Sequence, residues 1–179
     1  MKQSDKKNFQ RDLTAVMPKD DVREKMSYLI FEEGCVLCTN ANILLKQSLE
    51  QHRFTPDEIK QLNGKKIHRD VFKEIYRYDY VHVVDGKLEC KKGMAKATFE
   101  LQETGDWFNW KVIFPQGRSV AIDHIGVGID LMTLVGKVTL ADQKTVRLEF
   151  YGQNRGILVR GSGYSTEESI ILMPRMLPS

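Results

Sequence analysis

The sequence has 179 residues, of which 41% are hydrophobic and 28% are charged, and its formal net charge is +3. This composition excludes a chain that is disordered throughout and fits one globular unit or two small ones. The start lacks the apolar segment of a signal peptide, no apolar run is long enough to cross a membrane, and three cysteines do not make a secreted disulfide framework, so we expect a cytoplasmic protein.

The period of the hydrophobic pattern changes near Asp79, from helical spacing before it to strand spacing after it. We therefore predict an α+β protein in which a helical N-terminal unit is followed by an antiparallel β-barrel or β-sandwich. The expected regions are a mobile N-terminal arm over residues 1–19, the helical unit over 20–78 and the β unit over 79–179.

Four helices are predicted in the helical unit, starting near Asp20, after Thr39, at Thr55 and near Ile67. The clearest local signal is the run from Thr55 to Glu58. It places Thr at the N-cap, Pro at the first helical position and Glu where it completes a capping box. This pattern predicts a short helix that ends near Leu62.

A β-hairpin is predicted after these helices, because Asp85-Gly86 stands between alternating apolar residues. Helices followed by a hairpin over residues 40–90 resemble a winged helix-turn-helix module. The resemblance implies a recognition helix at residues 67–78 that enters the major groove of DNA, with basic side chains on the phosphates. The candidate nucleic-acid-binding residues are His68, Arg69, Lys73 and Arg77.

The charge distribution and an alternative fold bear on this interpretation. Residues 1–78 hold 15 Lys and Arg against 12 Asp and Glu, whereas residues 79–179 hold 12 of each, so attraction to nucleic acid belongs to the first half. Asp70 and Glu74 interrupt the basic face, however, and a small helical bundle packed on a sheet fits the same pattern. Both folds stay open.

The second half alternates apolar and polar residues as antiparallel strands do. Strands are predicted at residues 95–102, 108–114, 120–122, 138–140, 146–150, 157–160 and 170–173. Glycines interrupt the later strands and indicate strong coiling of the sheet. A closed barrel would have either a solidly packed interior, which we favour, or a cavity for an apolar ligand.

Cys35-Val36-Leu37-Cys38 before a predicted helix has the placement of a thiol redox motif, because a helix N-terminus lowers the pKa of the attacking thiol. The surrounding stretch is similar to the strand-CxxC-helix opening of thioredoxin-like proteins. The rest of the chain lacks the alternation of helices and parallel strands of that fold. Cys35 and Cys38 as small core residues are the alternative.

No other constellation indicates an active site. Cys35, Cys38 and Cys90 with one histidine would make a zinc set, but the second paired motif of such sites is missing, so we expect no metal. Asp123 and His124 are neighbours, and adjacent strand residues point to opposite faces.

The function that we expect from the sequence is non-enzymatic binding, without a cofactor, through a surface of the β unit. The expected partner is a protein or a small apolar ligand, and nucleic acid is possible. One alternative is a DNA-binding regulator that uses the winged-helix-like segment. The other is a thiol-redox protein that uses Cys35 and Cys38.

Overall fold

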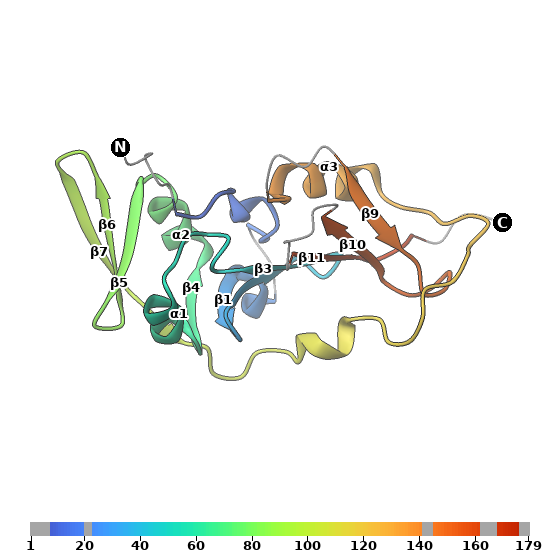
Figure 1. Ribbon diagram of the computed structural model, residues 1–179, viewed down its shortest axis with the longest axis horizontal. Coiled ribbons are helices and arrows are strands. Elements are labelled where there is room, and N and C mark those ends of the chain that lie inside the picture. The colour runs from blue at the N-terminus through green and yellow to red at the C-terminus, as the bar shows by residue number, and fades with distance from the viewer. Residues whose placement is uncertain (1–7, 20–22, 141–144, 162–167, 176–179) are drawn as a thin grey trace.

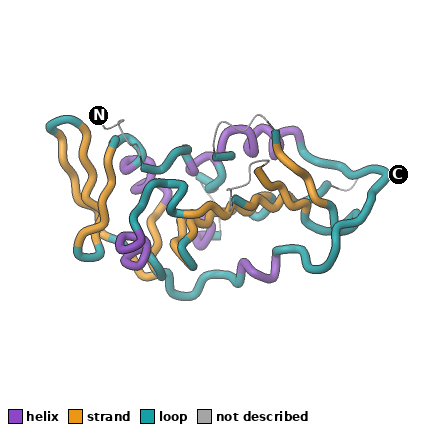
Figure 2. Tube along the Cα trace, viewed as in Figure 1, coloured by secondary structure: helices purple, strands orange, loops and turns teal. Residues whose placement is uncertain are grey.

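The computed structural model describes residues 8–19, 23–140, 145–161 and 168–175, and consists mainly of antiparallel strands (Figures 1 and 2). The strands are β1 (Tyr28–Glu32), β2 (Cys35–Thr39), β3 (Ile43–Ser48), β4 (Lys65–His68), β5 (Tyr80–Val84), β6 (Lys87–Lys92), β7 (Ala95–Glu100), β8 (Gln102–Glu103), β9 (Val146–Glu149), β10 (Ile157–Gly161) and β11 (Ser169–Leu172). The helices are α1 (Pro56–Leu62), α2 (Arg69–Ile75) and α3 (Ile129–Val138), with the 3₁₀ turns η1 (Leu13–Ala15), η2 (Glu24–Ser27) and η3 (Trp110–Ile113).

The strands form two open sheets. The larger sheet has the order β8-β4-β1-β2-β3-β11-β10-β9, and the smaller sheet has the order β5-β6-β7. Strand β3 pairs with β11, from Lys46 opposite Ser169 to Ile43 opposite Leu172. A strand from the first third of the chain therefore lies beside a strand from the last third within the larger sheet. No described helix is both long and apolar enough to span a membrane.

The predicted helical N-terminal unit and its winged helix are wrong. Strands β1 to β4 lie in that region. The separate C-terminal barrel or sandwich is also wrong, because both sheets are open and the larger one combines strands from the two halves of the chain. The physical reason is burial of the larger sheet on both faces: Leu29 and Phe31 contact one core, whereas Ile30 between them contacts the other. Such strands are continuously apolar, and over a short run that pattern is indistinguishable from a helix.

Several local predictions are confirmed. Helix α1 begins with the capping box, in which the Thr55 side chain accepts a hydrogen bond from the Glu58 backbone and Glu58 accepts one from the Thr55 backbone. Asp85 and Gly86 form the β5–β6 turn with positive φ angles of 50° and 72°, as a two-residue hairpin turn requires. Strands β7, β9, β10 and β11 lie where alternation predicts strands.

Three other predicted strands are wrong. Residues 108–114 form a loop with the turn η3, residues 120–122 are not a strand, and Val138 ends helix α3. In the first case, Val112 points to solvent with 75% of its surface exposed, although Trp110 on the same predicted face is buried. The alternating residues therefore do not share a face.

The larger core lies between the eight-stranded sheet and a layer that contains η1, α2 and α3. Phe9 and Leu13, from the region predicted as a mobile arm, are fully buried in it, and residues 1–7 lie outside the described part. The Phe9 ring packs edge-on against Phe72 of α2 and Phe54, at centroid distances of 4.9 and 5.2 Å. In Figure 1, α2 and α3 lie along the upper side of this sheet.

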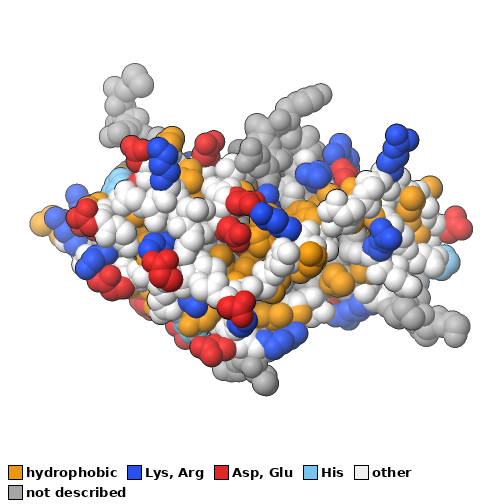
Figure 3. Space-filling model, turned by 90° about the horizontal axis from the view of Figure 1, so that it is seen from below, with side chains coloured by type: hydrophobic (Ala, Val, Ile, Leu, Met, Phe, Trp, Pro, Cys, Tyr) orange, Lys and Arg blue, Asp and Glu red, His pale blue; other side chains and the backbone are white. Residues whose placement is uncertain are grey.

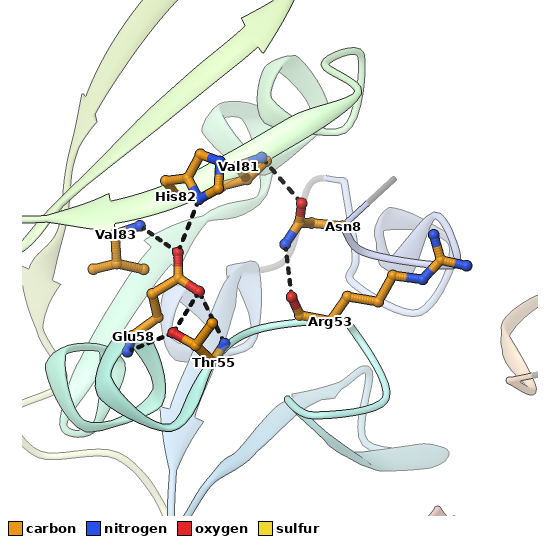
Figure 4. A network of polar contacts seen from close by, with 7 residues as sticks. All are labelled: Asn8, Arg53, Thr55, Glu58, Val81, His82 and Val83. Atoms are coloured by element: carbon orange, nitrogen blue, oxygen red, sulfur yellow. Dashed lines mark hydrogen bonds and ion pairs between the residues drawn. The ribbon is translucent and has the colours of Figure 1, made fainter. Parts of the chain in front are cut away.

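The smaller sheet is joined to this core by a network of polar contacts (Figure 4). Beyond its role in the capping box, Glu58 accepts a hydrogen bond from the Val83 backbone at 3.1 Å and contacts His82 at 3.2 Å. Asn8 bridges the two parts, because it donates to the Arg53 carbonyl and accepts from the Val81 backbone. One carboxylate thus fixes both the start of α1 and the position of β5.

Candidate functional site

A long segment between β8 and α3, residues 104–128, crosses the face of the larger sheet that is opposite the helices, along the lower side in Figure 1. We refer to it as the connector. Its aromatic side chains pack on the sheet beside Ile30, Leu37 and Leu44. The Trp107 indole donates to the Lys25 carbonyl and the Trp110 indole to a Glu32 carboxylate oxygen, both at 2.8 Å. These bonds hold the connector in place.

Beside the connector lies an apolar groove of about 210 Å³, which we take as the candidate site. Its floor is formed by the sheet, and Phe108 and Ile113 of the connector form one wall. The complete lining is Met26, Thr39, Ala41, Leu44, Phe108, Ile113, Ile171 and Met173. Figure 3 views this face and shows hydrophobic side chains at the surface between charged ones.

The groove is open to solvent and suited to apolar ligands. Met173, which directly follows β11, keeps 40% of its surface exposed, and Phe108 and Ile113 are half-buried. The Thr39 hydroxyl donates to the Ile43 carbonyl at 2.7 Å and accepts from the Ala41 backbone, so its hydrogen bonds are made within the protein. An apolar side chain can therefore enter without breaking a hydrogen bond of Thr39.

A second, more polar hollow of about 660 Å³ lies along the connector and shares Phe108 with the groove. It is lined by Glu32, Asn63, Gly64, Thr104, Gly105, Trp107, Phe108, Asn109, Trp110 and Lys111. Several of its polar groups are already used: Glu32 accepts from Trp110, Asn63 accepts from the Glu33 backbone, and Lys111 pairs with Glu33. The apolar groove is the better candidate for a binding site, because exposed apolar side chains are stabilised when an apolar partner covers them.

The predicted nucleic-acid residues lie around α2, but two of them make structural contacts. His68 caps the helix by accepting a hydrogen bond from the Asp70 backbone. The Arg69 side chain is only 13% exposed and donates to the Met17 carbonyl. Lys73 and Arg77 are exposed, and Arg77 pairs with Glu74 at 2.9 Å. The structure brings these four residues to one helix without making them one continuous surface.

Cys35 and Cys38 both lie on β2 and are buried. Residues three apart on a strand point to opposite faces, and their Cα atoms are about 10 Å apart, which is too far for a disulfide. Burial also raises the pKa of the Cys38 thiol, so its reactive thiolate is disfavoured. There is no helix N-terminus after Cys38, where the redox interpretation needs one, because β2 continues to Thr39 and β3 follows.

A buried polar network joins the two ends of the chain beneath α3. Gln47 donates to Glu168 and to the Val138 carbonyl, and the Leu140 backbone also donates to Glu168. His52 accepts from the Gln10 backbone at its Nδ1 and donates from Nε2 to Gln47, which requires a neutral ring. Burial accordingly lowers the pKa of His52 to about 3. Because the side chains of His52 and Glu168 are both buried, we interpret this network as structural.

Within the described residues, no three His, Cys, Asp or Glu side chains are grouped so that they could hold a metal ion. Burial raises the pKa of Cys90 to about 12, and Cys90 lies in the smaller sheet facing the core. Asp123 and His124 are exposed in the connector.

Sequence reasoning missed the groove because its lining comes from four separated stretches of the chain. Met26 and Leu44 lie in regions where the sequence predicts helices, and Phe108 lies in a predicted strand. One local signal was available. Asn109 is the N-cap of η3, with its side chain accepting from the Lys111 backbone, and such a cap argues against a continuous strand.

No protein-family model matches the sequence, and no curated protein does. Among solved structures, the fold is similar to that of the DNA polymerase sliding clamp from Bacillus subtilis, with a TM-score of 0.67, 11% identity and 96% of this chain covered. It is also similar to two structures from Pseudomonas aeruginosa. A sliding clamp with ligand gives a TM-score of 0.61 at 13% identity, and a DNA polymerase III subunit beta gives 0.62 at 14%, each covering 92% of this chain. The chain spans 62% of the length of each of these three proteins. At these identities the comparison establishes the fold.

Proposed function

We propose that this chain is a non-enzymatic, sliding-clamp-type subunit that surrounds duplex DNA and tethers partner proteins to it. The observation that carries the proposal is the similarity to three sliding-clamp structures over more than nine-tenths of the chain. The binding function expected from the sequence agrees with this proposal at the coarse level.

The proposed ring is assembled from more than one copy of this chain. The open sheets supply edges for such an assembly. In the described part of the chain, β8 and β9 end the larger sheet, and β5 and β7 end the smaller one. Unpaired strand edges readily pair with another chain, so edge-to-edge contact between copies is the proposed route to a ring.

The helical side of the larger sheet is the proposed DNA side. Lys73 on α2, Arg77 just after α2 and Lys137 on α3 are exposed. Isolated lysines contact phosphates without reading bases, and this suits a protein that must move along DNA of any sequence. This assignment keeps Lys73 and Arg77 from the sequence prediction and replaces base recognition with backbone contact.

The apolar groove is the proposed docking site for partner proteins. Its volume of about 210 Å³ is below the roughly 300–1,000 Å³ of pockets that enclose a whole small ligand. It suits one or two large apolar side chains of an extended peptide instead. We therefore favour a protein partner over the small apolar ligand that the sequence left open.

The docking site is tested with a displayed library of random short peptides, selected on the wild-type protein and measured by fluorescence anisotropy. Met173→Glu and Ile113→Glu each place a charge in the groove and should weaken the selected peptides at least tenfold. The control is Met94→Glu at the tip of the β6–β7 hairpin, which should bind as the wild type does. Peptides that bind both groove variants as tightly as the wild type would remove this site.

A further inference from the structure

One end of the smaller sheet carries a cluster of lysines. We define the hairpin tip as residues 91–96, which join β6 to β7 and include Lys91, Lys92 and Lys96. All six residues are exposed, and none of the three lysines forms an ion pair with another described residue. Met94 at the apex has 99% of its surface exposed.

The strand register places two of these charges against each other. Lys91 lies directly opposite Lys96 in the antiparallel pair of β6 and β7. Residues directly opposite point to the same face, and like charges in that position are unfavourable. At the other end of the same pair, Lys87 lies opposite Glu100 and forms an ion pair of 2.7 Å. The hairpin therefore carries a compensated pair at one end and an uncompensated one at its tip.

The hairpin tip lies beside the end of α2. The Lys91 carbonyl accepts a hydrogen bond from the Asp79 backbone at 3.1 Å, and Lys91 pairs with Tyr80, so Lys91 is close to the residues that follow α2. Figure 1 shows the β6–β7 turn projecting toward the same side of the molecule as α2 and α3. Lys73 and Arg77 are therefore on a stretch of chain next to the three exposed lysines of the hairpin tip. Three carboxylates, those of Glu74, Asp79 and Glu89, lie on the same stretches of chain.

We propose that the hairpin tip is a second DNA contact, in which Lys91, Lys92 and Lys96 bind phosphates of the duplex backbone. The partner follows from charge complementarity, because a row of phosphates supplies the closely spaced negative charges that adjacent lysines lack within the protein. The inference rests on the proposed function in taking duplex DNA as the ligand.

The test measures binding of a fluorescently labelled duplex of random sequence, by anisotropy, over 50–200 mM salt. Each phosphate contact contributes about 0.9 to the slope of log K against log salt. The triple variant Lys91→Gln, Lys92→Gln, Lys96→Gln should reduce that slope by about 2 to 3 and weaken binding at least tenfold at low salt. The control, Lys60→Gln, Arg118→Gln, Arg155→Gln, removes the same charge from exposed positions away from the tip, α2 and α3, and should keep the wild-type slope.

The outcomes separate the two proposals. If wild-type protein binds and the tip variant keeps the wild-type slope, or if both triple variants lose affinity equally, the hairpin tip is not a DNA contact and the proposed function stands. If wild-type protein does not bind duplex DNA at 50 mM salt, both proposals fail. If the tip variant binds DNA normally but the mass of its assembly changes, the lysines contact an acidic surface of a second copy. That result would overturn the proposed DNA contact.

Discussion

Single residues at the junctions of this fold serve two elements at once. The capping box of Thr55 and Glu58 was predictable, because it is local in sequence. The second role of Glu58, accepting from the Val83 backbone, was not, because it depends on where the smaller sheet packs. Likewise, nothing around Gln47 or His52 signals that the two side chains contact each other, or that Gln47 reaches Glu168 far along the chain.

Replacing Glu58, a buried charged residue of α1, should destabilise the protein strongly. Glu58→Ala removes the acceptor for the Thr55 and Val83 backbones, and unsatisfied or charged hydrogen bonds of this kind cost about 2–3 kcal/mol. Urea unfolding measures the change. The control Asp57→Ala lies on the same helix with its side chain 90% exposed, and should stay within about 0.5 kcal/mol of wild type. Equal effects of the two substitutions would contradict the double role.

The stabilisation by Glu58 should also depend on pH. Burial alone would raise the pKa of Glu58, but hydrogen bonds from Thr55, Val83 and His82 outweigh it and hold the pKa below its usual value of 4.5. A depressed pKa stabilises the folded state above the unfolded value, and this contribution is lost as the pH falls through the folded value. The advantage of wild type over Glu58→Gln should therefore shrink between pH 7 and pH 3, and an advantage that grows would refute it.

Glu168 should have the opposite dependence. Burial raises its pKa above 4.5 despite hydrogen bonds from Gln47 and the Leu140 backbone and the nearby charge of Arg11, and His52 stays neutral over this range. Wild-type stability should then fall as the pH rises above 4.5 until the folded pKa is passed, by up to about 1.4 kcal/mol per pH unit. Glu168→Gln should remove this fall and be the more stable protein at pH 8. A variant that is less stable at pH 8 and keeps the pH dependence would contradict the buried-charge account.

At the scale of elements, the β5–β6 hairpin, which has one exposed face, was predictable, whereas β1, β2 and β3, whose inner positions are buried on both faces, were not. Strand β11 is also buried throughout but was predicted. The exposed and buried positions of β5 and β6 alternate, and alternation correctly indicated that hairpin. By contrast, β2 is buried at every position, as are all but one of the residues in β3, so their sequences carry no strand period. The connector is the reverse case, since its aromatic residues alternate without forming a strand.

The connector should depend on Trp110 for its position. This side chain is 6% exposed, packs against Phe114 at 5.5 Å and lies beneath the Lys46 ammonium. Trp110→Ala should cost about 3–5 kcal/mol in urea unfolding and make the connector more sensitive to limited proteolysis under native conditions. Val112→Ala is the control, because Val112 is 75% exposed in the same turn. Unchanged cleavage of the connector in Trp110→Ala would show that other contacts hold it.

At the scale of the whole molecule, sequence patterns could not supply the strand order. The larger sheet depends on β3 pairing with β11, which joins strands from opposite ends of the chain, and local periodicity carries no information on such a pairing. A predicted division into unlike halves followed from the pattern, whereas the structure places strands of both halves in one sheet. The similarity to sliding clamps became visible only in this arrangement.

Encirclement of DNA is the central claim, and topological retention tests it most directly. Dilute protein is concentrated in the presence of closed circular plasmid or of linear plasmid of the same sequence. The protein copies are then cross-linked to one another through their amines, and the DNA is washed in high salt. We predict that cross-linked protein stays on the circle, is released when a restriction enzyme cuts that circle, and is absent from linear plasmid. Equal retention on circular and linear DNA, or retention that survives cutting, would contradict a ring around DNA.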